Sequence, residues 1–336
     1  MADKLPGEPS TEAVAIPSRA HNARQETIRA IRVHIFGQAP RVDHVPVPAG
    51  VGPGELLVEL AAAGVGAWDV GVASGRLAKL LPGGDMPLTM GAELCARVCA
   101  LGAGVEDLAV GERVMANPGV FGAWAERVRL RASDCARAPQ RVSDAEAATL
   151  PVRGLAAWQS LALLDLPADA SLLVVGAGGA VGRAVVEIAR GRGLRVLAVA
   201  GSGGLDMLRQ LGAETAVDYR GEWSPRIAAA ASGGVDAVLD LVGGDSLEQA
   251  IGLVRARGRV VSTVATGPRV ASPAGVTFHF VKMKSSRAAL TALAELVDAG
   301  GLSTRITKRF AFEAAPAALD AAAAPDREPG EIVLCR

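Results

Sequence analysis

The sequence has few cysteines, and those it has are scattered. Four cysteines occur in 336 residues, at Cys95, Cys99, Cys135 and Cys335, without C-x-x-C spacing. This pattern argues against a clustered-cysteine metal site and against a disulfide framework, and it is typical of a reducing compartment. Cys95 and Cys99 are expected on the same face of one strand. We interpret them as small buried hydrophobic residues.

Net charge and long apolar runs are also lacking. Basic and acidic residues number 35 each and are spread along the chain, so neither nucleic acid nor a membrane surface is predicted as a partner. No apolar run is long enough to span a membrane, and no secretory signal is visible. We expect a cytoplasmic enzyme with a small-molecule substrate. Residues 1–28 are polar and contain three prolines, which predicts a flexible leader outside the fold.

A glycine-rich turn stands in mid-chain, within LLVVGAGGAVGRAVVEIARG at residues 172–191. The apolar run 172–175 predicts a buried strand, and the apolar spacing from 181 to 188 predicts a helix with one apolar stripe. Glycines let a backbone approach a ligand closely, and helix N-termini bind anions. The turn therefore predicts a pyrophosphate site. Its glycines are Gly176, Gly178, Gly179 and Gly182.

Strands and helices alternate after this turn. Further strands are expected at 194–200, 215–219, 235–243, 259–264 and 276–281, with helical segments between them. Six strands with helical crossovers predict an α/β fold, a doubly wound parallel sheet of the Rossmann type, which binds ligands at the carboxyl ends of its strands. An S-adenosylmethionine-dependent methyltransferase shares this turn and stays an alternative at this point.

The rest of the chain has a different pattern. Residues 29–150 carry short strand-like pieces such as ELLVELAAAGV and ARVCALG, bounded by Gly or Pro. This pattern predicts a compact, mainly antiparallel β domain. A helix around 290–297 and the final strand EIVLC are expected to return to that domain.

Nine segments, in order and at matching spacing, resemble the medium-chain dehydrogenase/reductase superfamily. They include VPVPAGVGPGELLVELAAAGVGAWDVGVASG, MGAELCARVCALGAGVEDLAVGERVMA, LPVRGLAAWQSL, the glycine turn and GVDAVLDLVGG. The resemblance covers nearly all of residues 29–336. It implies a GroES-like substrate domain over 29–150 and 286–336, around an inserted Rossmann NAD(P)-binding domain over 151–285. The active site is then expected in the cleft between the domains.

The zinc-ligand positions of this superfamily carry other residues here. Zinc-dependent members have a cysteine where this chain has Gly66, and a GHE motif where it has Gly91, Ala92 and Glu93. A zinc site cannot close without thiolate or imidazole ligands. The resemblance therefore implies the zinc-independent quinone oxidoreductase and enoyl reductase branch, with no metal. It implies hydride transfer to the C=C of an enone, enoyl thioester or quinone, as in a tailoring enzyme of secondary metabolism.

The resemblance leaves the catalytic residues open. An Asn that reaches the cofactor in many relatives is replaced by Gly66, and the Tyr proton donor of enoyl thioester reductases by Leu77. Two candidates remain. Asp69 is either a general acid or a carboxylate that stabilises a turn, and we favour the turn. His279, on the sixth strand, is either catalytic or an ordinary packed or surface histidine, and we favour the second.

The residues expected to face the ligands fall into two groups. Gly66, Trp68 and Phe121 are candidates for lining the substrate cleft, although aromatic residues more often belong to the core. The other group, expected to contact the cofactor, comprises Gly176, Gly179, Ala180, Val181, Gly182, Ser202, Tyr219, Val242, Val264, Phe280 and Val281.

The end of the second Rossmann strand predicts which nicotinamide is used. NAD-binding sites place an acidic residue there for the ribose hydroxyls, whereas this chain has Ala200, Gly201 and Ser202. The missing acid leaves room for a 2′-phosphate and favours NADPH over NADH. Arg209 or Arg220 is the expected phosphate partner. The same missing acid argues against the methyltransferase alternative.

Two other functions stay open, together with a question of assembly. One alternative is a catalytically quiet NADPH-binding sensor or scaffold, because the usual Asn and Tyr are missing. The other is a carbonyl reductase of the alcohol dehydrogenase kind. The segment VTFHFVKMK resembles an edge strand, and zinc-free relatives commonly dimerise through the outer Rossmann strand, so a homodimer is expected.

Overall fold

The computed structural model describes residues 26–81, 86–325 and 327–336. Strand β1 spans Thr27–Val33. The leader expected over residues 1–28 therefore lies outside the described residues up to position 25, and the prediction is wrong for Thr27 and Ile28. Ile28 is buried in the core of the β domain. The alternation of buried and exposed residues in β1 already begins at Thr27, directly after polar residues that had suggested a leader.

One sheet has six parallel strands in the order β11, β10, β9, β12, β13, β14. This is the doubly wound arrangement predicted from the alternating segments. Its strands are β9 Ser171–Val175, β10 Arg195–Ala200, β11 Thr215–Asp218, β12 Val235–Asp240, β13 Val254–Ser262 and β14 Thr277–Phe280. Its helices are α3 Pro151–Leu164, α4 Ala180–Gly191, α5 Leu205–Leu211, α6 Trp223–Ala230 and α7 Gly244–Ile251.

Successive residues of these strands point into two separate cores. Leu172 and Val174 of β9 pack in the cluster that also holds apolar residues of α3 and α4. Leu173 and Val175 pack instead against the apolar residues of α6 and α7. Both faces of the sheet are therefore covered by helices, which explains why β9 is apolar at every position after Ser171.

The second large sheet has seven strands, mostly antiparallel, in the order β15, β16, β3, β5, β6, β8, with β7 also paired to β3. Their bounds are β3 Glu55–Val65, β5 Leu94–Leu101, β6 Arg113–Ala116, β7 Arg127–Arg131, β8 Cys135–Arg137, β15 Ile306–Ala311 and β16 Glu331–Cys335. A smaller sheet joins β1 to β2 Arg41–Pro46 and β4 Leu88–Thr89.

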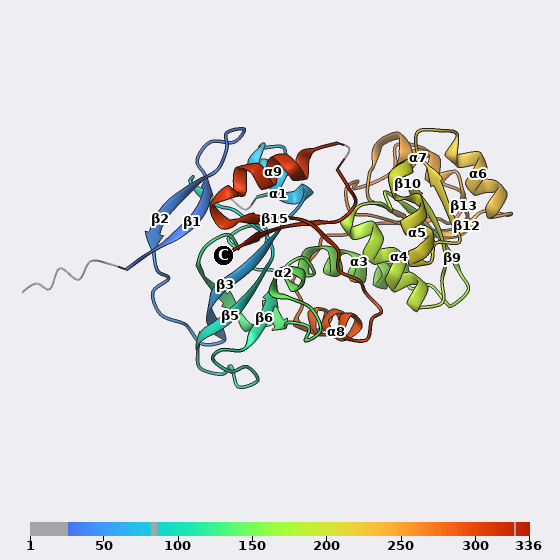
Figure 1. Ribbon diagram of the computed structural model, residues 1–336. Helices are drawn as coiled ribbons and strands as arrows, with labels where there is room; N and C mark the ends of the chain where they lie inside the picture. The colour runs from blue at the N-terminus through green and yellow to red at the C-terminus, as the bar shows by residue number, and fades with distance from the viewer. Residues whose placement is uncertain (1–25, 82–85, 326) are drawn as a thin grey trace, which may run out of the picture.

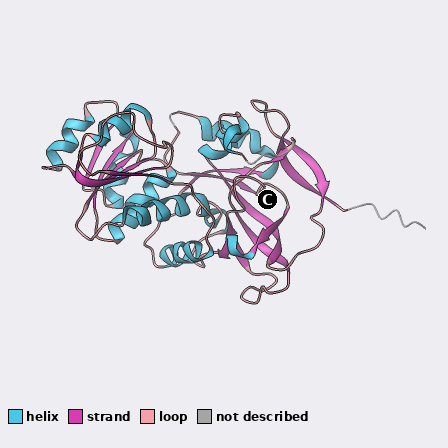
Figure 2. Ribbon diagram, turned by 180° about the vertical axis from the view of Figure 1, so that it is seen from behind, coloured by secondary structure: helices cyan, strands magenta, loops and turns pink. Residues whose placement is uncertain are grey.

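Four further helices belong to this half: α1 Ala67–Ala73, α2 Asp144–Ala147, α8 Arg287–Asp298 and α9 Ala315–Ala323. Short 3-10 helices span Ala78–Leu80, Ala132–Asp134, Ser202–Gly204 and Phe312–Ala314. Figure 1 shows the two large sheets on opposite sides of α3, with the chain returning through α8, β15 and β16. Figure 2 shows helices above and below the six-stranded sheet.

The two cysteines of β5 have different surroundings, contrary to the expectation that both are buried on one face. Cys95 is buried and Cys99 is exposed. The pairing of β3 with β5 skips Cys99, since Leu57 pairs with Ala100 and Val58 with Val98. Burial nevertheless alternates from Ala96 to Cys99, and Cys95 is buried because it packs in the cluster that also holds apolar residues of α3. In the described part of the chain, no helix is both long enough and apolar enough to cross a membrane.

Candidate active site

The glycine turn brings the backbone of the first turn of α4 into contact with the backbone that follows β9. Gly176 has φ +87°, a conformation that side chains disfavour. A Cβ atom at Gly182 would lie 2.5 Å from the carbonyl oxygen of Gly176 and 2.6 Å from Cα of Ala177. Gly179 is the N-cap of α4 and has no side-chain cap, so the first N–H groups of a 12-residue helix stand at an exposed turn. This arrangement fits the pyrophosphate of a dinucleotide.

Exposed hydrophobic side chains lie at, or just after, the carboxyl ends of β11, β12, β13 and β14. Tyr219, Val242, Val264 and Phe280 are between 43% and 55% exposed, an unusual state for residues beside a close-packed sheet. Val242 Cγ2 lies 2.8 Å from the position of a Cβ at Gly176, and Val264 Cγ2 lies 3.3 Å from one at Gly243. These residues, all predicted to contact the cofactor, therefore lie together at the carboxyl edge of the sheet, where the flat rings of a cofactor can pack against them.

Asp240 and Ser262 hold this edge in place, and sequence reasoning missed both. They end β12 and β13 and are fully buried. The Asp240 carboxylate accepts hydrogen bonds from the N–H groups of Val242 (3.0 Å) and Gly243 (2.8 Å) and from the Ser262 hydroxyl (2.7 Å). Ser262 Oγ accepts in turn from the N–H of Val264 at 3.1 Å. The sequence feature that could have identified them is a polar residue at the end of each of two apolar strands.

The remaining predicted residues of this half differ in exposure. Ala180 and Val181 open α4 and are partly exposed. Val281 is buried, and its N–H donates to Ser262 O at 2.8 Å, so its side chain is not available to a ligand. His279 lies in the edge strand β14, opposite Val261, and is exposed. The surface interpretation of His279 thus agrees with its position.

The end of β10 has one arginine directed at it. Ala200 pairs with Asp218 of β11, and the Asp218 carboxylate accepts from the N–H of Arg220 at 3.0 Å. Arg220 Nη1 lies 3.5 Å from Ser202 Oγ, and its guanidinium lies 5.4 Å from the centre of the Tyr219 ring. Ser202, Tyr219 and Arg220 therefore form one exposed group.

Arg209 is engaged elsewhere. Its guanidinium donates to Asp206 of its own helix at 2.6 Å and to the carbonyl oxygen of Ala216 at 3.2 Å. The sequence left Arg209 and Arg220 as alternatives for a phosphate. Of these two side chains, Arg220 is the one that contacts Ser202 at the end of β10.

Asp69 caps the start of α1. It is 4% exposed, and its Oδ2 accepts from the N–H of Gly66 at 2.9 Å. Its Oδ1 is buried with no hydrogen-bond partner. Burial, the largest cause, raises the pKa of Asp69 to about 7, against the opposing effect of the Gly66 N–H. The structure shows the turn carboxylate that we favoured, and its pKa lies near neutral pH.

Glu93 is a second carboxyl beside Asp69, and it is partly buried. Its Oε2 accepts from the N–H of Val152, near the start of α3, at 2.7 Å. Burial raises its pKa to about 8, and the charges of Asp69 and Glu331 add to the rise while Arg153 opposes it. Glu93 thus joins the first strands of the β domain to the helix that leads into the Rossmann sheet.

The residues at this corner do not fit zinc. Gly66 has no side chain and Ala92 carries only a methyl group, so neither position offers a ligand atom for zinc. Among the described residues, no group of three or more His, Cys, Asp or Glu side chains is placed to hold a metal ion. A Cβ at Gly66 would meet nothing within 4 Å, so open space stands there.

Trp68 and Phe121 come from two segments that a hydrogen bond joins. Trp68 Nε1 donates to the carbonyl oxygen of Val120 at 2.8 Å, which brings α1 against the segment that carries Phe121. Both rings are partly buried and pack on the core of the β domain. Each ring therefore has a core face, and the lining role predicted for them remains a prediction.

Two surface cavities lie away from both regions. One, of about 280 Å³, is lined by residues before β12 and β13, at the amino ends of the strands. The other, of about 250 Å³, lies between α1 and α9. Neither is lined by a predicted site residue.

The fold therefore combines a parallel sheet, whose glycine turn fits a dinucleotide, with a mainly antiparallel β domain. Two family descriptions match the chain: "Alcohol dehydrogenase GroES-like domain" over residues 52–140, and "Zinc-binding dehydrogenase" over residues 211–334. The chain belongs to the medium-chain dehydrogenase/reductase superfamily, as its sequence indicated.

Individual relatives differ in how much they share with this chain. A mycocerosic acid synthase-like polyketide synthase of Mycobacterium tuberculosis is 35% identical over 214 residues, covering 62% of this chain but 10% of that protein. An NAD-dependent alcohol dehydrogenase of Sulfolobus acidocaldarius is 26% identical over 330 residues, covering 87% of this chain and 95% of that protein. An alcohol dehydrogenase superfamily protein from Novosphingobium aromaticivorans superposes with a TM-score of 0.85, at 26% identity, covering 92% of this chain and all of that one.

Proposed function

We propose that the protein is a zinc-independent, NADPH-dependent reductase that transfers hydride to the C=C of an enone, enoyl thioester or quinone. The observation that carries this proposal is a dinucleotide turn combined with side chains at positions 66 and 92 that have no zinc-ligand atoms. Zinc polarises the carbonyl of an alcohol and ketone pair. Conjugate reduction, in which charge collects on a distant oxygen, is the chemistry that depends least on such a metal.

The chain's residues have separable tasks in this proposal. The α4 N–H groups and the glycine turn hold the pyrophosphate, and the apolar side chains at the strand ends cover the cofactor's rings. The nicotinamide supplies the hydride when it is bound. Asp240 keeps the Val242 and Gly243 backbone in position at this edge. The substrate is expected beside Gly66, where the structure leaves space for it.

The preference for NADPH rests on the end of β10. No carboxylate from β10 itself occupies that end, and the Asp218 carboxylate is engaged by the Arg220 N–H. Arg220 and Ser202 offer a guanidinium and a hydroxyl close together, the donors that a 2′-phosphate needs.

Enoyl thioesters are favoured among the acceptors by the similarity to a mycocerosic acid synthase-like polyketide synthase. The similarity to an NAD-dependent alcohol dehydrogenase favours a second candidate, a carbonyl reductase. The test is NADPH oxidation with crotonyl thioester, cyclohexenone, a benzoquinone and matched saturated ketones. Turnover of the unsaturated compounds alone supports the proposal. Reduction of the ketones alone supports the second candidate, and no turnover with tight NADPH binding supports a sensor or scaffold.

We also propose a homodimer formed through β14. This strand ends the sheet order, so within the described part of the chain one of its sides has no neighbouring strand. Unpaired strand edges are surfaces for pairing with a second copy. A monomeric mass at micromolar concentration in light scattering would contradict this proposal.

A further inference from the structure

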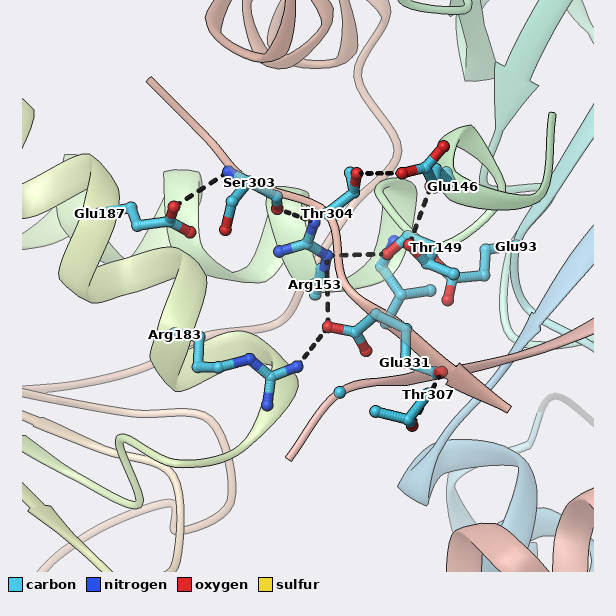
Figure 3. Close-up of polar contacts among 12 residues, drawn as sticks. Glu93, Glu146, Thr149, Arg153, Arg183, Glu187, Ser303, Thr304, Thr307 and Glu331 are labelled. Atoms are coloured by element: carbon cyan, nitrogen blue, oxygen red, sulfur yellow. Dashed lines mark hydrogen bonds and ion pairs between the residues drawn. The ribbon is translucent and has the colours of Figure 1, made fainter. Parts of the chain in front are cut away.

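Three charged side chains meet in a buried cluster between the two halves of the molecule (Figure 3). Arg183 comes from the first turn of α4, Arg153 from α3 and Glu331 from the start of β16. Their side chains are 5%, 4% and 10% exposed. Burying charge is expensive unless each group is paired, so this cluster requires an explanation.

Arg183 links the glycine turn to the β domain. Its Nη1 donates to the carbonyl oxygen of Gly178 at 2.9 Å, and its Nη2 donates to Oε1 of Glu331. One planar guanidinium therefore bonds at the same time to the turn and to a strand of the other sheet. The Gly178 carbonyl belongs to the peptide just before Gly179, which caps α4.

Glu331 lies at the end of the β-domain sheet that is close to Gly66. The ladder between β16 and β3 ends where Ile332 pairs with Val65, so Glu331 is the next residue, on the side of Gly66. The Glu331 N–H donates to Arg305 O at 2.7 Å, which fixes its backbone. The carboxylate that receives Arg183 thus belongs to the same end of the β domain as the open space at Gly66.

Arg153 contacts the same glutamate without touching the turn. Its Nε lies 3.7 Å from Glu331 Oε1, and it donates to Thr149 O at 3.1 Å and to Ser303 O at 2.7 Å. Figure 3 shows both arginines directed at one carboxylate. The two arginines therefore share burial and partner, and only Arg183 reaches the glycine turn.

We propose that Arg183 is a positioning residue for the cofactor: anchored on Glu331, it fixes the glycine turn relative to the end of the β domain that faces the substrate space. The inference rests on the proposed function, because it needs a dinucleotide at the turn. A turn held in its binding conformation loses less entropy when the ligand binds. Removing Arg183 or Glu331 should therefore weaken cofactor binding by more than the accompanying loss of fold stability would explain.

Arg183→Met and Arg153→Met form a matched pair for the test, since each removes one buried arginine from Glu331. NADPH affinity is measured by fluorescence titration of the full chain, with a thermal melt of each variant. Loss of the charged hydrogen bond to the turn should raise the Kd of Arg183→Met about tenfold, while Arg153→Met changes it less than about threefold. Glu331→Gln combined with Arg183→Met should add little to Arg183→Met alone, because one linkage is removed twice.

Several outcomes would overturn the proposal. Parental affinity in Arg183→Met does so, and so does equal weakening in both single variants, which would assign the cluster to folding alone. If Arg183→Met does not fold, Arg183→Lys keeps the charge but lacks the planar fork, and parental affinity in that variant decides against the proposal. A parent protein that binds neither NADPH nor NADH refutes the proposed function itself, and the inference with it.

Discussion

Gly182→Ala should destabilise the protein strongly, because the new Cβ meets backbone atoms. It would stand 2.5 Å from the Gly176 carbonyl oxygen and 2.6 Å from Ala177 Cα, and neither atom can rotate away. Helix α4 must then move off β9. Overpacking of a core costs about 1–3 kcal/mol, and a contact with backbone belongs at the upper end of that range. We expect a loss of about 3 kcal/mol, a large share of a typical net stability.

Gly191→Ala is the control within the same helix. Gly191 is the last residue of α4, and a Cβ there meets nothing within 4 Å, so alanine should leave stability unchanged or raise it by up to about 1 kcal/mol. Urea unfolding monitored by circular dichroism gives both values. With a slope of about 3 kcal/mol/M, the midpoint of Gly182→Ala should fall by about 1 M. Equal midpoints for the two variants would refute the close approach of α4 to β9.

Three further predictions concern protons, the phosphate and metal. Glu93 keeps its proton up to about pH 8 in the folded state, whereas in the unfolded state it loses the proton near its ordinary pKa of 4.5. The free energy of unfolding should therefore fall as the pH rises from about 4.5 to about 8. Each raised carboxyl contributes a slope of roughly 1 kcal/mol per pH unit, and Asp69 contributes its own up to about pH 7, so Glu93→Gln should reduce the slope below pH 7 and remove the Glu93 contribution between about pH 7 and 8; an unchanged slope in urea titrations contradicts the assignment. Arg220→Ala should weaken NADPH binding about tenfold and leave NADH unchanged; parallel losses would exclude a phosphate contact. Prolonged chelation should leave turnover unaltered, whereas loss of stoichiometric zinc together with activity would contradict a zinc-independent site.

The Rossmann sheet could be predicted from local patterns because its strands are short apolar runs separated by helical periods. Val175 and Gly176 mark the end of β9 in the sequence as clearly as they do in the structure. The bulge at Cys99 could not be predicted, since it depends on the register with β3, which two distant segments decide together. The first residues of β1 were missed for a similar reason: a strand is defined by its partner as well as by its own residues.

The candidate site was only partly accessible from the sequence. The glycines and the missing acid after Ala200 are local signals, and they led to the cofactor edge. The contact of Arg183 with Glu331 joins residues 148 positions apart, and the choice between Arg209 and Arg220 depended on where Asp206 and Ser202 stand. Pairings of this kind become visible only when the chain is folded.

The central claim is that the turn between β9 and α4 holds a nicotinamide dinucleotide, and Gly179→Val tests it most directly. Gly179 is exposed, and a Cβ there meets only the Gly176 carbonyl oxygen, at the ordinary distance of 3.5 Å. The fold therefore has room for a valine side chain at this position, but that side chain would occupy the place of a bound pyrophosphate. In a fluorescence titration of parent and variant with NADPH, the account predicts that the variant melts like the parent and binds at least about tenfold more weakly. A variant that binds NADPH as tightly as the parent would contradict it.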